Sequence, residues 1–232
     1  MLGYHSSPVR WCEVPYTHST HIVEWYNTLS NASFVAVALW LRTQFRCGNL
    51  PPALPALFLL LGLCSAWFHG TLSLAGQLAD EVLIIWIALL SIGHFAQLPP
   101  AAVGFCTVAA VLALGMFPSL NHKLLIAGLL ALMALLDLAV GTTQPHEVWA
   151  AWRRSLRWLG LSLVAWVLDL QLCRPGGQQL HFHAWWHLLV AVASVHLAAV
   201  GCCVLGRHPC RLAYRCGGLL PVSCWALCAV DG

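Results

Sequence analysis

Residues His183–Leu205 read HAWWHLLVAVASVHLAAVGCCVL, an apolar run that contains no Asp, Glu, Lys or Arg. A helix needs roughly 20 mostly apolar residues to cross a bilayer, so this run predicts a transmembrane helix. His183 and His187 lie four positions apart, which places both imidazoles on one face of a helix, about one turn apart. Because ionisable groups inside a membrane are costly, this pair marks a candidate functional site.

The composition of the whole chain agrees with a membrane protein. Of the 232 residues, 60% are hydrophobic and only 8% are charged, and the mean hydropathy is +0.77. A soluble domain rarely has such a composition. The net charge of +3 comes without a block of basic residues, so we expect no nucleic-acid partner.

Seven apolar segments predict an all-α membrane protein, a bundle of seven transmembrane helices. They are Thr28–Leu41, Pro52–Phe68, Leu78–Ala96, Ala101–Phe117, Leu124–Val140, Leu156–Leu172 and His183–Leu205. The predicted organisation is an N-terminal lumenal segment (1–27), one membrane domain (28–205) and a cytoplasmic tail (206–232).

The basic residues predict the orientation, because Lys and Arg near the ends of spans collect on the cytoplasmic side. With the N-terminus outside, eight basic residues lie inside and three outside. The inner ones are Arg42, Arg46, Arg153, Arg154, Arg157, Arg207, Arg211 and Arg215, and the outer ones are Arg10, Lys123 and Arg174. We therefore expect a lumenal N-terminus and a cytoplasmic C-terminus.

A third histidine strengthens the prediction of a metal site. His69 lies near the outer end of the second span, at the depth of His183 and His187 in the seventh. Two histidines alone could simply bond to neighbouring carbonyls, but three suit zinc and leave one coordination position open. A water bound there has a pKa near 7 and becomes a hydroxide nucleophile. We therefore predict a catalytic zinc ion.

Two carboxylates and a hydroxyl are candidates for the chemistry around the metal. Asp80 and Glu81 begin the third span at its outer end, and we choose Asp80 as general base, although spacing alone barely separates the two. A carboxylate at a helix N-terminus could instead offset the helix dipole. Ser65 precedes His69 by four residues and could bond the zinc water or the oxyanion, or only its own backbone.

Asp169, near the outer end of the sixth span, is a further candidate. It could accept a hydrogen bond from a metal-binding histidine and so orient that ring. The alternatives are that it caps a helix end or pairs with Arg174.

The chain resembles the alkaline ceramidase family over most of its length, on three blocks of residues. The blocks are Trp11-Cys-Glu13 with Glu24-Trp-Tyr-Asn-Thr-Leu-Ser-Asn31, then Ser65-Ala-Trp-Phe-His69 continuing to Asp80-Glu81, and His183-Ala-Trp-Trp-His187. The family consists of seven-helix membrane amidases with a zinc held by three histidines. By motif, the resemblance implies His69, His183 and His187 as zinc ligands, with Ser65 and Asp80 beside them.

The resemblance also concerns a calcium site in the N-terminal segment, where this chain departs from the pattern. Trp11, Glu13 and Glu24 match that site, but Arg10 stands where the family has an Asp and Pro15 where it has an Asn. Calcium takes six to eight oxygen ligands. Because two side-chain ligands are lost and a cation is gained, we expect calcium binding to be weak or absent.

The resemblance further implies a disulfide between Cys12 and Cys173. The predicted topology places both outside, where oxidation is permitted.

The expected function is hydrolysis of the amide bond of ceramide, taken from the lipid bilayer, to sphingosine and a fatty acid. The resemblance implies the endoplasmic reticulum or Golgi membrane. The alternatives are a non-enzymatic seven-helix receptor with a structural zinc, an inactive paralogue, and a transporter or scaffold whose histidines bind no metal.

Overall fold

The structure is a computed structural model that describes residues 6–44, 51–95, 97–119, 127–128, 130, 134, 137–138, 146–173, 177–204, 210–215 and 220–226. This part of the chain is mostly helical, as the apolar segments predict. Its elements are α1 (Trp25–Ser30), α2 (Ala32–Gln44), α3 (Leu54–Thr71), α4 (Leu74–Phe95), α5 (Pro100–Met116), α7 (His146–Gln171), the 3-10 helix η1 (Gly177–Leu180), α8 (Phe182–Val204), and the strands β1 (Cys210–Arg215) and β2 (Leu220–Ala226).

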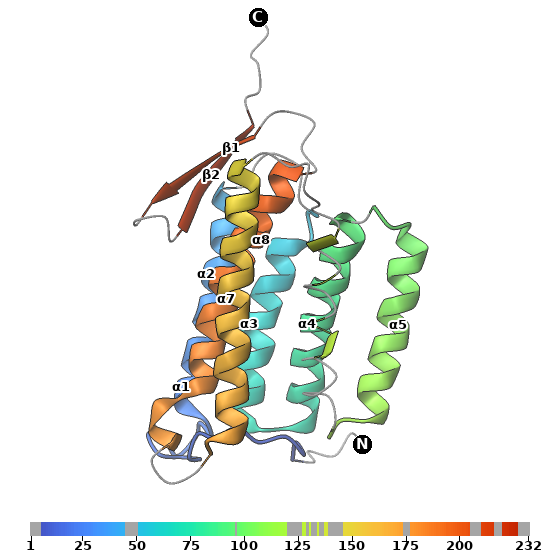
Figure 1. Cartoon of the computed structure of the whole chain (residues 1–232). Coiled ribbons are helices and arrows are strands. Elements are labelled where there is room, and N and C mark those ends of the chain that lie inside the picture. The colour runs from blue at the N-terminus through green and yellow to red at the C-terminus, as the bar shows by residue number, and fades with distance from the viewer. Residues whose placement is uncertain are drawn as a thin grey trace, which may run out of the picture.

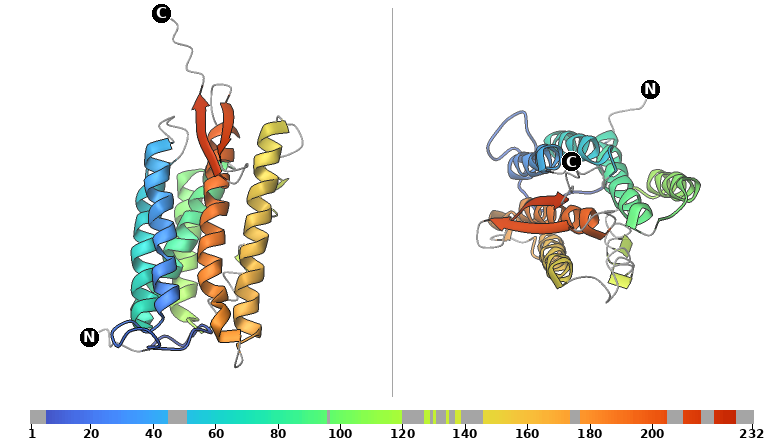
Figure 2. Two further views of the ribbon diagram at one scale, coloured as in Figure 1. Left: turned by 90° about the vertical axis from the view of Figure 1, so that its left-hand side faces the viewer. Right: turned by 90° about the horizontal axis from the view of Figure 1, so that it is seen from above.

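The long helices run side by side along one axis (Figure 1). Helix α3 contacts α2 and α4, and α8 contacts both α7 and α2. Helix α5 lies at the periphery, against α4 (Figure 2). The buried apolar side chains of α2, α3, α4 and α8 form the main core.

The N-terminal segment, residues 6–24, crosses one end of this bundle, and the β1–β2 hairpin lies at the other end (Figure 1). Backbone hydrogen bonds fasten the segment to the corner between α3 and α4. The Ser7 N–H donates to the Leu72 carbonyl at 2.8 Å, and the Glu24 N–H donates to the His69 carbonyl at 3.1 Å. The segment therefore closes the end of the bundle at which α3 ends and α8 begins.

Three helical stretches of the described chain are long and apolar enough to cross a membrane. They are Leu54–Thr71, Leu74–His94 and Gly177–Cys203, and Pro100–Met116 is apolar but shorter. Such helices characterise an integral membrane protein.

The count of seven spans and their sidedness stay predictions. The predicted fifth span, 124–140, lies largely outside the described residues. The N-terminal segment and the hairpin do lie at opposite ends of the bundle (Figure 1).

Helix α4 begins earlier than the predicted third span. It starts at Leu74, and its first turn holds no acidic residue, so Asp80 and Glu81 lie well inside the helix. The suggestion that they offset the helix dipole is therefore wrong, because that effect fades beyond the first turn.

Two other predicted spans have different boundaries in the structure. The first is divided into α1 and α2, with Asn31 between them. The sixth is only the second half of α7, which starts at His146 and includes Arg153, Arg154 and Arg157. Arg is a good helix former, so the helix continues past the apolar segment that defined the prediction.

The antiparallel hairpin of β1 and β2 is a departure from the all-α prediction. The sequence holds a signal for it, because Gly217-Gly218 stands between the two segments, and a pair of glycines between strand-forming runs is typical of a hairpin turn.

Candidate metal centre and catalytic residues

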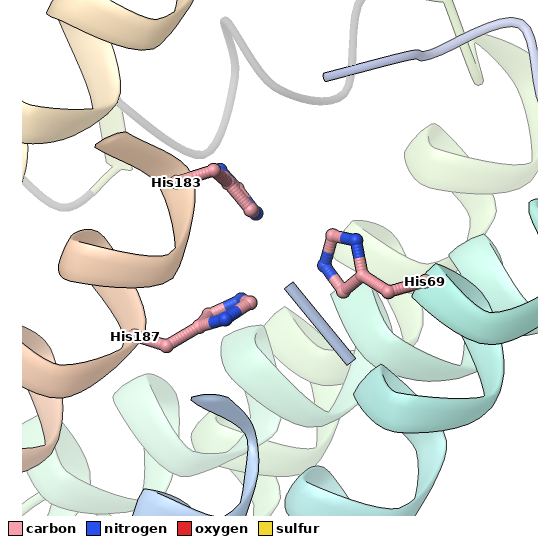
Figure 3. A group of neighbouring side chains, drawn as sticks. All are labelled: His69, His183 and His187. Atoms are coloured by element: carbon pink, nitrogen blue, oxygen red, sulfur yellow. The ribbon is translucent and has the colours of Figure 1, made fainter. Parts of the chain in front are cut away.

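His69, His183 and His187 meet inside the closed end of the bundle, as the sequence predicts. His69 lies in the last turn of α3, and the other two lie in the first turns of α8. Their exposed fractions are 0%, 2% and 0%. The three rings point toward one another (Figure 3), and one ligand nitrogen from each lies within 4.8 Å of the others.

Hydrogen bonds determine which nitrogen of His187 faces the centre of this cluster. Nδ1 of His187 lies 2.7 Å from the Ser30 hydroxyl, and that hydroxyl donates to the Asn27 carbonyl at 2.9 Å. A serine hydroxyl has a single hydrogen, so a bond from Ser30 to Asn27 leaves Ser30 to accept from a protonated Nδ1. Nε2 of His187 is thus left with a free electron pair.

His69 is oriented in the same way by a carboxylate. Its Nδ1 lies 2.6 Å from Oε2 of Glu24, and both side chains are buried. With Nδ1 donating to Glu24, Nε2 of His69 is the atom left for a ligand. A carboxylate behind a histidine is a frequent arrangement at metal sites, because it fixes the ring and raises its basicity.

The three histidines fit a metal ion of the zinc type. Among the described residues, neither Nε2 of His69 nor Nε2 of His187 has a hydrogen-bond partner, although both are buried. Buried polar atoms without partners are rare in proteins and call for an explanation. Three imidazoles with converging electron pairs suit zinc with an open fourth position. The cluster contains no carboxylate or cysteine from the described part of the chain.

Trp11, from the N-terminal segment, covers His183. The two rings stack with centroids 3.7 Å apart and planes 20° apart. Trp186 also stacks on His183, with centroids 5.3 Å apart and planes 21° apart. The ring of His183 thus stacks with two indoles, whereas the rings of His69 and His187 are oriented by hydrogen bonds.

The structure separates Asp80 from Glu81, which the sequence barely does. The Ser65 hydroxyl is hydrogen-bonded to the Asp80 carboxylate, which is buried, and Oδ1 of Asp80 has no partner among the described residues. The Gln77 amide donates to Glu81 at 2.9 Å. Asp80 and Ser65 therefore face each other, with Ser65 one turn from His69 on α3.

Asp169 contacts the backbone of His183 instead of its ring. Its Oδ1 accepts the His183 N–H at 3.2 Å, and its Oδ2 accepts the Cys12 N–H at 3.0 Å. Of the predicted roles, the cap of a helix end agrees with these contacts. Arg174, the other suggested partner, lies outside the described residues.

The residues of the predicted calcium site lie together, but their carboxylates are occupied. Glu13 accepts the backbone N–H groups of Tyr26 and Asn27 at 2.7 and 2.9 Å. Glu24 accepts the Trp11 N–H at 3.4 Å and the Asn27 amide at 3.0 Å, besides the bond from His69. These bonds are in keeping with the expectation of weak or absent calcium binding, which stays a prediction.

Burial changes the acidity of both glutamates. It raises the pKa of Glu13 above its ordinary value, while hydrogen bonds from Asn27 and Tyr26 lower it. Burial raises the pKa of Glu24 to about 7, against hydrogen bonds from Asn27 and Trp11 that lower it. A cation at the three histidines would favour the ionised form of Glu24.

Cys12 and Cys173 also lie together. Their side chains are in hydrogen-bonding contact, but both are free thiols in the structure. The disulfide stays a prediction that this proximity permits.

Sequence reasoning missed two groups of this centre, Ser30 and the role of Glu24 beside His69. Both lie in the stretch EWYNTLSN, Glu24–Asn31, which was singled out only for its resemblance. The available signal was its density of hydrogen-bonding side chains just before a span.

Comparison with known proteins identifies the family of this chain. The family model described as Ceramidase matches residues 3–209. The chain is 28% identical to alkaline ceramidase 1 of Homo sapiens over 215 residues, which cover 83% of this chain and 80% of that protein. It is 29% identical to alkaline ceramidase of Drosophila melanogaster over 210 residues, 82% of this chain and 74% of that protein. With a match over nearly its whole length, the chain belongs to the ceramidase family.

Proposed function

We propose that this protein hydrolyses the amide bond of ceramide and releases sphingosine and a fatty acid, in sphingolipid metabolism. The observation that carries the proposal is the buried cluster of His69, His183 and His187 in a chain of the ceramidase family. Ser65 lies one turn from His69 on α3 and is hydrogen-bonded to Asp80 of α4. A receptor with a structural metal would have no need of a buried carboxylate with an unpaired oxygen beside the metal.

His69, His183 and His187 would hold a zinc ion. When bound by three histidines, zinc acts as a Lewis acid and makes a water molecule nucleophilic near neutral pH. Glu24 and Ser30 position the rings of His69 and His187, so that both Nε2 atoms face the same point.

Asp80 serves as the general base and then as the general acid. It takes a proton from the attacking water as the oxygen of that water bonds to the amide carbon. It then returns the proton to the nitrogen as the carbon–nitrogen bond breaks, so that sphingosine leaves as a neutral amine and the acid keeps the water oxygen. Such proton transfers contribute typically 10²–10⁴-fold to a rate.

Ser65 links these two steps. While Asp80 is a carboxylate, the hydroxyl of Ser65 donates to it. Once Asp80 has gained a proton, it no longer needs the hydrogen bond from Ser65. The Ser65 hydroxyl can then rotate and donate its hydrogen bond to the oxyanion formed on the carbonyl oxygen. The oxyanion thus receives a donor at the stage at which its charge develops.

An apolar cavity supports a lipid substrate. It is lined by Phe34, Leu61, Ile84 and Trp186, among others. Leu61 lies one helical turn from Ser65 on α3, and Ile84 lies one turn from Asp80 on α4, so each lining residue is on the same face of its helix as the candidate catalytic residue. The cavity therefore begins directly beside the candidate catalytic residues.

We further propose that the protein spans the endoplasmic reticulum or Golgi membrane seven times. The candidate site would then face the lumen. Ceramide would enter from the bilayer.

Product analysis with ceramides tests this function. The purified protein with zinc should release sphingosine and fatty acid, whereas Asp80→Asn should lose at least about 100-fold in kcat and retain its zinc. Glu81→Gln is the matched control, a buried carboxylate on the same helix, and should keep most of the activity. A protein that binds zinc and hydrolyses no ceramide would instead be a receptor or an inactive paralogue. His187→Ala should lose zinc, and unchanged metal content would point to a scaffold or transporter.

A further inference from the structure

A second apolar void continues from the cavity beside the catalytic residues toward the other end of the bundle. The two share part of their walls, since Phe58, Ile87 and Ser194 line both. The first void reaches Trp186, next to His187, and the second reaches Leu54 and Ala198. The two voids therefore adjoin one another along α8, and together they are called the slot.

The lining of this slot suits a hydrocarbon chain. Its serine hydroxyls already donate to backbone carbonyls: Ser91 to Ile87 at 2.7 Å, Ser194 to Val190 at 2.8 Å and Ser155 to Ala193 at 3.1 Å. Apart from His94 in the second void, the other lining residues are apolar, so a polar occupant would gain little there and lose its hydration.

The length of the slot follows from the helix that lines it throughout. Trp186 and Ala198 are twelve residues apart on α8, which is about 18 Å at 1.5 Å per residue. An extended alkyl chain advances by roughly 1.3 Å per carbon, given its bond length of ~1.5 Å. The slot therefore takes about 14 carbon atoms between the catalytic residues and its far end.

We propose that this slot measures one aliphatic chain of the substrate, and that small residues on α8, Ala193 and Ala198, determine the chain length that is accepted. The inference rests on the proposed function and makes it specific. Ala193 lines the void nearer to the metal ligands, and Ala198 lines only the far one. A leucine at position 193 would fill the void nearer to the metal ligands, and a leucine at position 198 would fill the far void.

The test measures kcat/KM for two series of ceramides, one with acyl chains of 6 to 24 carbons and one with sphingoid chains of varied length. For the wild type, kcat/KM should rise with the length of one of the two chains until about 14 carbons and rise no further. The series that shows this dependence identifies the chain that enters the slot. If kcat/KM does not depend on chain length in either series, the wild type alone overturns the proposal.

The substitutions then test the residues. Ala193→Leu should reduce kcat/KM for 16-carbon chains about tenfold, while that for 6- or 8-carbon chains stays within about twofold. Ala198→Leu should affect only chains that reach the far end. Ala199→Leu is the matched control, because Ala199 is buried on the same helix but does not line the slot. It should destabilise the protein and leave the ratio of long-chain to short-chain rates unchanged.

The failure of this inference differs from that of the proposed function. No hydrolysis of any ceramide overturns both. Hydrolysis with the same length profile in wild type, Ala193→Leu and Ala198→Leu overturns only the measuring slot, as does an equal shift in Ala199→Leu.

Discussion

Oε2 of Glu24 lies 2.6 Å from Nδ1 of His69, and the backbone N–H of Glu24 donates to the carbonyl of that same histidine. The two residues are 45 positions apart in the chain. Glu24 is therefore joined to one residue of α3 twice, through its side chain and through its backbone. This double contact makes the N-terminal segment part of the candidate metal centre.

Replacing Glu24 by Gln should weaken metal binding more than it weakens the fold. The amide keeps the shape but removes the negative charge behind His69, and loss of such a partner typically costs roughly 10- to 100-fold in metal affinity. Zinc affinity can be measured by competition with a chromophoric chelator. Glu81→Gln is the control and should bind zinc like the wild type. Equal zinc affinities in the wild type, Glu24→Gln and Glu81→Gln would show that Glu24 does not contribute to metal binding.

The cluster of three histidines was predictable from the sequence because its signals are local. His183 and His187 repeat at helical spacing within one span, and His69 lies at the end of another. The distance of a residue from the end of its span gives its depth in the membrane. The structure confirms that these three residues come together.

The partners of the histidines were not predictable because they depend on the path of a segment without regular structure. Residues 6–24 cross the end of the bundle, and only that path brings Glu24 to His69. The choice between Asp80 and Glu81 depended on helix rotation, since adjacent residues of a helix face directions about 100° apart. That rotation follows from packing, which turns Asp80 toward Ser65.

Ser30→Ala should weaken zinc binding by releasing His187. The hydroxyl of Ser30 is the only described group bonded to Nδ1 of that ring, so its removal leaves a buried N–H without an acceptor. We expect a loss of about tenfold in zinc affinity, from the cost of one buried unpaired donor. Ser33→Ala is a close control, because the Ser33 hydroxyl bonds to the backbone carbonyl of His187, at 3.4 Å, and not to its ring. If both variants lose affinity equally, the effect belongs to the packing of α8.

Calcium should not stimulate this protein. The oxygens of Glu13 and Glu24 already accept hydrogen bonds from Tyr26, Asn27 and Trp11, so a calcium ion would have to compete with them. In calcium-free buffer with zinc supplied, activity and the midpoint of thermal unfolding should stay unchanged as calcium is added to millimolar levels.

A variant makes this prediction about calcium sharper. Arg10→Asp combined with Pro15→Asn restores a carboxylate and an amide at the two positions that depart from the family pattern, and removes a cation. We expect this double variant to gain a calcium-dependent rise in thermal midpoint. A wild-type protein that already responds to micromolar calcium would contradict the prediction.

Asp169 should be needed for stability and, through the N-terminal segment, for metal binding. Its two oxygens join Cys12 of that segment to His183 at the start of α8. Asp169→Ala leaves both N–H groups without this acceptor, which should cost on the order of 3 kcal/mol and lower the thermal midpoint. Zinc affinity should fall as well, because Trp11 and Glu24 belong to the loosened segment. Asp137→Ala is the control, since Asp137 accepts the Trp152 indole N–H at 2.8 Å on another part of the bundle. It should lower stability alone, so a loss of zinc affinity common to both variants would contradict the link between Asp169 and the metal.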